Sequence, residues 1–255
     1  MKLEIDTGGR SLRVEDAAQS RTLPLYSREA FEMVSREWVR MGWALGYYTT
    51  FTWSGRPILQ LPEDLIRLQE AIVTLQPDVI VEMGIYDGGS LLFHATLCEA
   101  MGKGRVIGVD KQIGEATRTA LATHRLAGRI EAIEADSTAP ATTAAVRGLI
   151  GAEERVMVIL DSHHSKQHVA RELEAYAPMV SPGSCIVATD GIMEDLADVP
   201  GGEAGWREDN PAAAAREFAA AHPEFEMRQP AWLSNRSPLE KNITYWPDGW
   251  LWRKA

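Results

Sequence analysis

From residue 78 onward, short apolar runs rich in β-branched residues alternate with longer segments of helical periodicity. This alternation is typical of βαβ units, which place parallel strands in one sheet. Because the strands are apolar on both faces, we expect helices to cover both sides of the sheet. The predicted strands are residues 79–82, 105–109, 130–133, 156–160 and 185–188, and the predicted intervening helices are 89–101, 114–126, 138–150 and 166–178.

The segment ahead of this alternation predicts helices at residues 28–48 and 62–75. Pro62 stands at a first-turn position, and the acidic residues after it favour the positive start of a helix. We therefore expect residues 1–76 to form a helical extension. It should pack on the core domain, residues 77–255, or form a contact between subunits of a homo-oligomer.

The C-terminal part departs from the alternation. Residues 191–209 are rich in Gly, Pro and acidic residues, which predicts a long loop that serves as a lid. A helix should begin at Asn210-Pro211, since Asn caps helices well and Pro suits their first position. Strands near 225–228 and 243–246 should complete the sheet in antiparallel orientation. The predicted fold class is α/β, with a Rossmann-like and mostly parallel sheet.

Composition excludes several classes of function. The 255 residues suit one large domain, and 26 Lys and Arg against 36 Asp and Glu give a net charge of −10 without a basic cluster. Nucleic-acid binding is therefore disfavoured. The first residues lack the apolar stretch of a signal peptide, and no run approaches 18 apolar residues. We expect a cytoplasmic protein without a membrane span, in which Cys98 and Cys185 stay reduced.

The turn after the first strand, residues 82–90, carries candidate binding chemistry. Its sequence is Glu-Met-Gly-Ile-Tyr-Asp-Gly-Gly-Ser, which differs from the dinucleotide fingerprint because Tyr86 takes the second Gly position. Glu82 could meet an ammonium group, while backbone N–H groups around Gly84, Gly88 and Ser90 could meet a carboxylate. S-adenosylmethionine is a ligand with such an amino-acid moiety.

Acidic residues also end the next two strands. Asp110 could accept hydrogen bonds from ribose hydroxyls, and Asp136, followed by Ser137, could receive an adenine amino group. An acid at a strand end is often only a helix cap or a solvated turn. Three such acids at successive strand ends beside one Gly-rich turn favour an S-adenosylmethionine site at the carboxyl edge of the sheet.

The fourth and fifth strands end in Asp161 and Asp190, which should converge at the same edge. Two neighbouring carboxylates favour a hard cation such as Mg²⁺ between them, although two separately solvated caps would also fit the pattern. His164 follows Asp161 by three residues and is a candidate general base. We expect His163 to face elsewhere.

A rival hypothesis uses His168, four residues after His164. Asp161, His164 and His168 would then form the two-histidine, one-carboxylate iron site of an oxygenase. We prefer to interpret His168 as an exposed helix residue. A third possibility is a protein that binds S-adenosylmethionine without turnover.

Several motifs together resemble the rhamnosyl O-methyltransferases and the cephalosporin hydroxylase-like proteins of antibiotic biosynthesis. The resemblance runs from about Trp53 to Arg253. Its main motifs are residues 53–65, the turn at 82–90, residues 105–110 and the Leu-Asp-Ser-His-His-Ser segment at 160–165. It implies an enzyme that uses S-adenosylmethionine and a divalent metal to methylate hydroxyls, commonly on deoxysugars, with His164 as the base.

One position departs from that family. Many members have Glu-Asp on the metal at the end of the fifth strand, whereas this chain has Thr189-Asp190. The Thr189 oxygen or a water could take the vacated position.

The resemblance also implies a deoxysugar acceptor of rhamnose type, either nucleotide-linked or attached to an aglycone. A linked diphosphate would need cations, for which Arg56, Arg207 and Arg236 are candidates, while Trp53 and Trp206 could contact the sugar.

Overall fold

A seven-stranded sheet forms the centre of the computed structural model, which describes residues 1–16 and 19–255. Its strands are β6 (Val79–Met83), β7 (Arg105–Asp110), β8 (Ile130–Glu134), β9 (Val156–Leu160), β10 (Cys185–Ala188), β11 (Phe225–Met227) and β12 (Trp250–Arg253). The spatial order is β11-β12-β10-β9-β6-β7-β8. The five strands predicted from the alternation are parallel, and β12 is antiparallel to both β10 and β11. The predicted α/β fold with an antiparallel C-terminal strand is confirmed.

The chain reverses its direction of travel across the sheet between β6 and β9. It runs outward through β7 and β8, then returns to pair β9 with the other side of β6. Open α/β sheets bind ligands at the carboxyl ends of their strands, beside such a switch point. The topology alone therefore directs attention to the turns after β6 and β9.

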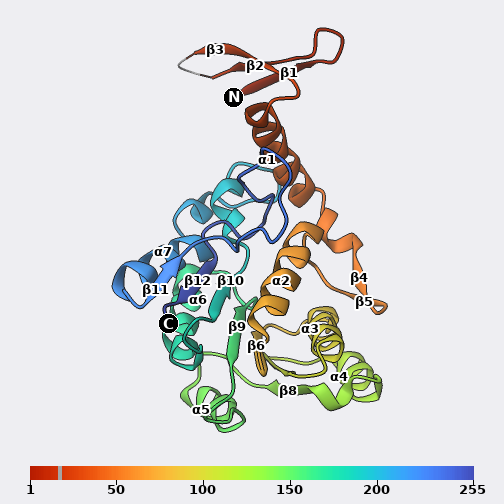
Figure 1. Ribbon diagram of the computed structural model, residues 1–255, viewed down its shortest axis with the longest axis vertical. Helices are drawn as coiled ribbons and strands as arrows, with labels where there is room; N and C mark the ends of the chain where they lie inside the picture. The colour runs from red at the N-terminus through yellow and green to blue at the C-terminus, as the bar shows by residue number, and fades with distance from the viewer. Residues whose placement is uncertain (17–18) are drawn as a thin grey trace.

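Helices cover both faces of the sheet, as its apolar strands require (Figure 1). Alternate strand residues divide between two cores, so that Ile80 packs with the α2 and α3 side and Val81 packs with the α5, α6 and α7 side. The helices are α1 (Arg28–Ala44), α2 (Pro62–Leu75), α3 (Gly89–Ala100), α4 (Glu115–Thr123), α5 (Pro140–Gly148), α6 (Lys166–Tyr176) and α7 (Pro211–Ala221). Short 3-10 helices are η1 (Tyr47–Thr50), η2 (Ala127–Arg129), η3 (Ala177–Met179), η4 (Gly191–Leu196) and η5 (Ala204–Arg207).

Helix starts follow the local sequence. Asn210 caps α7 by accepting a hydrogen bond from the Ala213 N–H at 2.8 Å, and Pro211 occupies the first turn as predicted. The α1 helix ends at Ala44, earlier than the predicted residue 48, because Gly46 adopts a left-handed conformation at φ 69°. Within the described part of the chain, no helix is both long enough and apolar enough to cross a bilayer.

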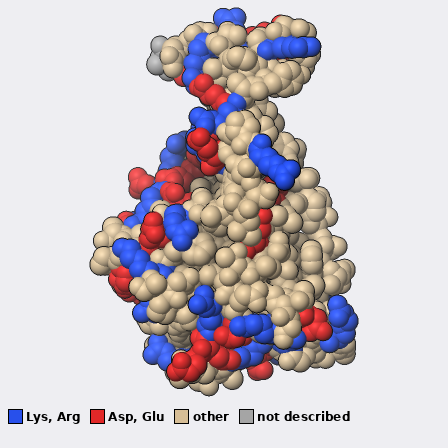
Figure 2. All heavy atoms as spheres, in the orientation of Figure 1, with Lys and Arg blue, Asp and Glu red and all other residues tan. Residues whose placement is uncertain are grey.

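The N-terminal extension is not purely helical. Strands β1 (Lys2–Asp6), β2 (Ser11–Glu15) and β3 (Ser20–Pro24) form an antiparallel sheet that stands away from the body above α1 (Figure 1 and Figure 2). The prediction missed this sheet, although apolar and polar residues alternate along both Lys-Leu-Glu-Ile-Asp and Ser-Leu-Arg-Val-Glu. Its buried core consists of Leu12, Val14 and Ala30. A further hairpin joins β4 (Thr52–Trp53) to β5 (Arg56–Pro57).

Two C-terminal expectations need correction. The predicted strand at 243–246 does not form, because the Tyr245 N–H and the Thr244 hydroxyl bind the Asp64 carboxylate instead of a neighbouring strand. The last strand, β12, begins four residues later, after the Pro-Asp-Gly turn. Residues 191–209 are not an open loop throughout, since they contain η4 and η5. Cys98 and Cys185 are buried and unpaired, as expected.

Candidate active site

A cavity of about 670 Å³ lies at the carboxyl ends of the parallel strands. Its wall combines the turns after β6 to β10 with residues just ahead of α2 and with Trp206 of η5. The predicted site residues that line it are Gly84, Ser90, Asp110, Asp136, Ser137, Asp161, His164 and Asp190. Glu82, Gly88 and Thr189 lie behind this wall.

The turn after β6 depends on a glycine. Gly84 has φ +96°, and a Cβ atom there would lie 1.9 Å from the Asp161 carbonyl oxygen. Only glycine permits this approach of the β6 and β9 ends. The next residues carry backbone strain, since Tyr86 adopts φ 45° without being a glycine.

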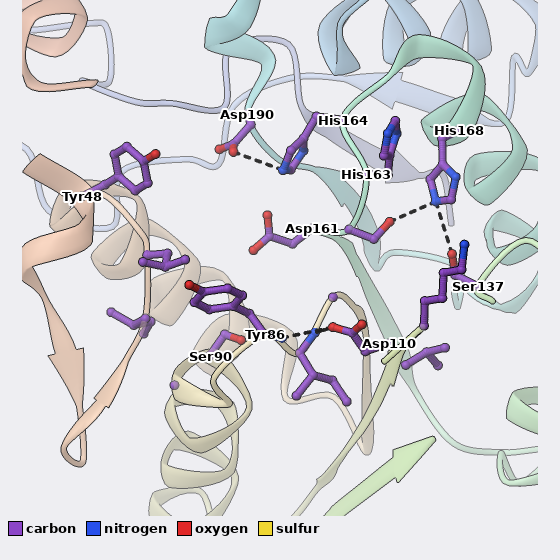
Figure 3. Close-up of a pocket in the computed structure, with 18 of the residues that line it drawn as sticks. Tyr48, Tyr86, Ser90, Asp110, Ser137, Asp161, His163, His164, His168 and Asp190 are labelled. Atoms are coloured by element: carbon purple, nitrogen blue, oxygen red, sulfur yellow. Dashed lines mark hydrogen bonds and ion pairs between the residues drawn. The ribbon is translucent and has the colours of Figure 1, made fainter. Parts of the chain in front are cut away.

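The Asp110 carboxylate holds this strained turn in place by hydrogen bonds. Its Oδ2 accepts hydrogen bonds from the N–H groups of Ile85 at 2.8 Å and Tyr86 at 3.1 Å (Figure 3). Its Oδ1 accepts from the Gln112 N–H at 3.0 Å. The carboxylate therefore shapes the cavity wall, and with about four acceptor sites it retains capacity for a ligand hydroxyl.

Glu82 is not exposed to the cavity, contrary to the expectation that it meets a ligand ammonium. It lies beneath α3, where the Ser90 hydroxyl donates to its Oε2 at 3.0 Å and the His94 Nε2 lies 3.4 Å from its Oε1. Burial raises the pKa of Glu82, and His94 opposes this shift. The reason for the difference is the pleat of β6, which turns this side chain toward α3.

Asp161, His164 and Asp190 converge on one point of the wall (Figure 3). One nitrogen or oxygen atom from each lies within 4.8 Å of the others, and His164 Nε2 is 3.4 Å from Asp190 Oδ2. The pKa of Asp190 is raised to about 6, chiefly by burial; His164 opposes this rise and Asp161 adds to it. The two carboxylates at this spacing are suited to a divalent cation, and the imidazole lies beside them.

Thr189 does not reach the cavity, so the structure corrects its expected place on a metal. It is fully buried, and its hydroxyl lies 2.6 Å from Asp161 Oδ1 and 3.0 Å from the Leu160 carbonyl oxygen. The other oxygen of the Asp161 carboxylate accepts a hydrogen bond from Gln60 Nε2 at 2.7 Å. Gln60 was not predicted as a site residue, because its only signal in the sequence is a polar residue between Leu59 and Leu61.

His163 and His168 both line the cavity, which corrects two expectations. His168 is not an exposed helix residue, because its Nε2 lies 3.1 Å from Oε1 of the fully buried Glu172. The hydrogen bond to Glu172 raises the pKa of His168. The hydroxyls of Ser137 and Ser162 donate to the same Glu172 oxygen, at 2.5 Å and 2.6 Å.

This network bears on the rival iron site. Among the described residues, the group with metal-ligand spacing is Asp161, His164 and Asp190, and it does not include His168. The two-histidine, one-carboxylate arrangement predicted for an oxygenase is therefore not formed in the structure.

Of the aromatic and basic residues predicted to contact a substrate, some line the cavity and others do not. Trp206 lines the cavity edge-on to Trp43, with ring centroids 5.3 Å apart. Trp53 instead packs on Phe93 and donates to Thr96. Arg56 is held by Asp87 and Thr117 and, like Arg207 and Arg236, does not line the cavity. Among the described wall residues, Lys111 is the single Lys or Arg, facing four Asp.

The sheet order and the cavity at its switch point define a Rossmann-like α/β protein with a site for a nucleotide-type ligand. The chain belongs to the Rhamnosyl O-methyltransferase/CmcI family, whose model matches residues 45–254. It is 31% identical over 151 residues to the Rhamnosyl O-methyltransferase of Mycobacterium leprae (strain TN), covering 57% of this chain and 62% of that protein.

The Rhamnosyl O-methyltransferase of Mycobacterium tuberculosis (strain ATCC 25618 / H37Rv) is 28% identical over 156 residues, covering 60% of this chain and 62% of that protein. The match thus spans less than two-thirds of the length of these relatives. Two solved structures, "cmcI-D160 Mg-SAM" and "CmcI-N160 apo-structure", are 19% identical and match with TM-scores of 0.54 and 0.53. They cover 81% of this chain and 78% and 77% of theirs, which confirms the predicted fold.

Proposed function

We propose that this protein is an S-adenosylmethionine-dependent, divalent-metal-assisted O-methyltransferase that acts on a deoxysugar hydroxyl. The observation that carries the proposal is the cluster of Asp161, His164 and Asp190 in the same cavity as the glycine-rich turn after β6. Family membership supports methyl transfer, and the names of the relatives support a rhamnose-type acceptor. The natural-product context is part of the proposal. The similar structure described with Mg and SAM supports both cofactors.

The wall residues fit these groups. The cavity volume of about 670 Å³ lies within the range of cofactor sites. Gly84, Ser90, Asp110, Asp136 and Ser137 would hold S-adenosylmethionine. The carboxylates of Asp161 and Asp190 would hold the cation, and the His164 imidazole would stay free beside it. Since Glu82 lies behind the wall, it would support Ser90 rather than touch the ligand.

The cofactors and the residues of the chain would have different roles in methyl transfer. Bound S-adenosylmethionine would supply the methyl group, and a divalent cation would lower the pKa of the acceptor hydroxyl. His164 takes the hydroxyl proton on its imidazole as general base, and Asp190, 3.4 Å away, orients that ring. Met193 and Trp206, from the region predicted as a lid, line the cavity and would exclude water from the bound substrate.

The charges of the wall favour a sugar attached to an uncharged aglycone over a nucleotide-linked sugar. A diphosphate in the cavity would face four Asp residues, and among the described wall residues Lys111 is the one Lys or Arg that could bind it. Arg56 already donates a hydrogen bond to the Asp87 carbonyl oxygen. A rhamnose-type acceptor with two adjacent hydroxyls should react faster than its analogue that lacks one of them, because the analogue loses one oxygen ligand to the cation.

A transfer assay tests the proposal. Labelled S-adenosylmethionine would be offered with rhamnosylated aglycones, nucleotide-linked rhamnose and catechols, in Mg²⁺ and in excess chelator. We expect methylation of the rhamnosyl glycoside that chelator abolishes and Mg²⁺ restores. Methylation of catechols alone would overturn the sugar assignment, and full activity in chelator would overturn the metal role. Calorimetry that compares the binding of S-adenosylmethionine with that of nicotinamide cofactors tests the choice of cofactor. Binding of S-adenosylmethionine without methyl transfer to any acceptor would favour a non-catalytic binding protein.

We also propose that the chain forms homo-oligomers through α1. Four large apolar side chains of α1 and its C-cap recur with heptad spacing. Their exposed fractions are 41% for Phe31, 37% for Trp38, 57% for Met41 and 85% for Leu45. Paired helices use this spacing, which favours α1 of a second copy as the partner. Light scattering should show an oligomer that Met41→Glu with Leu45→Glu dissociates, and a monomeric wild type would contradict the assignment.

A further inference from the structure

The Asp161 carboxylate is held by two neutral hydrogen-bond donors that come from distant parts of the chain. We propose that Gln60 and Thr189 are positioning residues that fix this carboxylate in the orientation in which it binds a divalent cation. The inference rests on the proposed function, because it assigns the residues that prepare the proposed metal site. Neither residue touches the cavity itself.

The geometry gives each carboxylate oxygen one donor. Gln60 Nε2 lies 2.7 Å from Asp161 Oδ2, and Thr189 Oγ1 lies 2.6 Å from Asp161 Oδ1. Gln60 is 5% exposed and Thr189 is 0% exposed, so water does not compete for these bonds. A carboxylate has about four acceptor sites, so each oxygen keeps capacity for a cation on the side that faces the cavity.

The Gln60 side chain is costly for the fold. Its Oε1 is buried and, among the described residues, has no hydrogen-bond partner. Burying an unsatisfied amide oxygen destabilises a protein, and an apolar residue of similar length would avoid that cost. Turning the amide around would place Oε1 against Asp161 Oδ2, where two acceptors repel. The bond from Nε2 to Asp161 is therefore what the amide contributes at this position.

Neutral donors suit this task better than a salt bridge would. Asp161 and Asp190 repel each other before a cation arrives, so an unsupported Asp161 side chain would turn away from Asp190. An arginine or lysine in place of Gln60 would hold Asp161 but cancel the charge that attracts the cation. An amide and a hydroxyl orient the carboxylate and leave its charge available.

The test measures metal binding directly, with Mn²⁺ alone added to the purified full chain and free Mn²⁺ followed by electron paramagnetic resonance. Gln60→Met removes the amide at nearly constant length, and Thr189→Val removes the hydroxyl at constant shape. We expect each to raise the Mn²⁺ dissociation constant about tenfold or more. Thr189→Ser, which keeps the hydroxyl, and Gln76→Met, at an exposed site after α2, should match the wild type.

Two further readouts separate positioning from a general structural effect. Transfer activity of Gln60→Met should return to the wild-type rate at saturating Mg²⁺, because the cation itself then holds the carboxylate. The double variant should raise the dissociation constant by less than the product of the single effects, because both donors act on one group. If Gln60→Met does not fold, Gln60→Asn, whose amide is one methylene short of Asp161, should show the same rise.

The outcomes distinguish this inference from the proposed function. A wild type that binds Mn²⁺ and transfers methyl groups, with folded Gln60 variants of unchanged Mn²⁺ affinity, overturns the positioning role alone. A rise in the dissociation constant that Thr189→Ser shares with Thr189→Val overturns the hydroxyl's part. A wild type that binds no divalent cation overturns both the metal-assisted mechanism and this inference.

Discussion

Asp110→Ala should weaken cofactor binding because it releases the turn that forms the cavity wall. In the structure the Asp110 carboxylate accepts from the N–H groups of Ile85 and Tyr86. Ile85 is 2% exposed, so its N–H would be left buried without a partner, at a cost of about 1–3 kcal/mol. Tyr86 is 65% exposed, so water would replace its bond. The variant turn would therefore relax away from its left-handed conformation at Tyr86.

If binding must restore the native turn, a cost of about 1–3 kcal/mol predicts a roughly five- to 140-fold rise in the dissociation constant. Calorimetry with S-adenosylhomocysteine measures this constant, and hydrogen exchange at the Ile85 amide measures the release of the turn. Asp78→Ala is the matched control, because Asp78 also accepts a backbone hydrogen bond but precedes the opposite end of β6. Unchanged affinity together with rapid exchange at Ile85 would refute the link between the turn and binding.

Three further perturbations follow from the site. His164→Ala should lower turnover about a hundredfold or more while cofactor affinity stays constant, because general-base catalysis supplies roughly 10² to 10⁴; equal losses in both would contradict the assignment. Since the pKa of Asp190 is raised to about 6, Mn²⁺ affinity should be constant near neutrality and fall as the pH drops below about 6, where a proton competes with the metal; a flat profile would exclude Asp190 as a ligand. Because Glu172 raises the pKa of His168 in the folded protein, protonated His168 should stabilise the fold. This contribution should be complete below the pKa of about 6.5 in the unfolded chain, and it should be lost as the pH rises through the higher pKa of the folded protein. Urea unfolding of the wild type and His168→Gln across this range should show a difference that shrinks at high pH.

The parallel sheet could be predicted from the sequence because apolar runs bury both faces of a strand. The strands at 156–160 and 185–188 begin and end where predicted, since turn residues follow each run. The convergence of Asp161 and Asp190 follows from the same logic, because parallel strands end at one edge of the sheet. The N-terminal sheet was missed because its short polar strands bury few residues and resemble exposed loops in composition.

The finer arrangement of the site could not be predicted. Glu82 lies near the end of β6, and Thr189 directly follows β10. Whether each side chain points into the cavity depends on the pleat of the strand and on packing against α3 or β9, which the sequence does not report. Gln60 is separated from Asp161 by 101 residues, and no local pattern reports a hydrogen bond over that distance. His168 was assigned to solvent because Glu172, its buried partner, has the appearance of an ordinary acidic helix residue.

The attachment of α2 to the late part of the chain has a consequence for biosynthesis. Asp64 binds the Tyr245 N–H at 2.7 Å across 181 residues of sequence. At a translation rate of about 5–20 residues per second, a ribosome needs roughly 10–40 s to produce the intervening chain. During that interval the first turn of α2 lacks this bond, and Ile58 and Leu59 immediately before it do not yet have the anchor that fixes their place in the cavity wall. We therefore expect the nascent polypeptide to become able to bind its ligand only after residue 245 has left the exit tunnel.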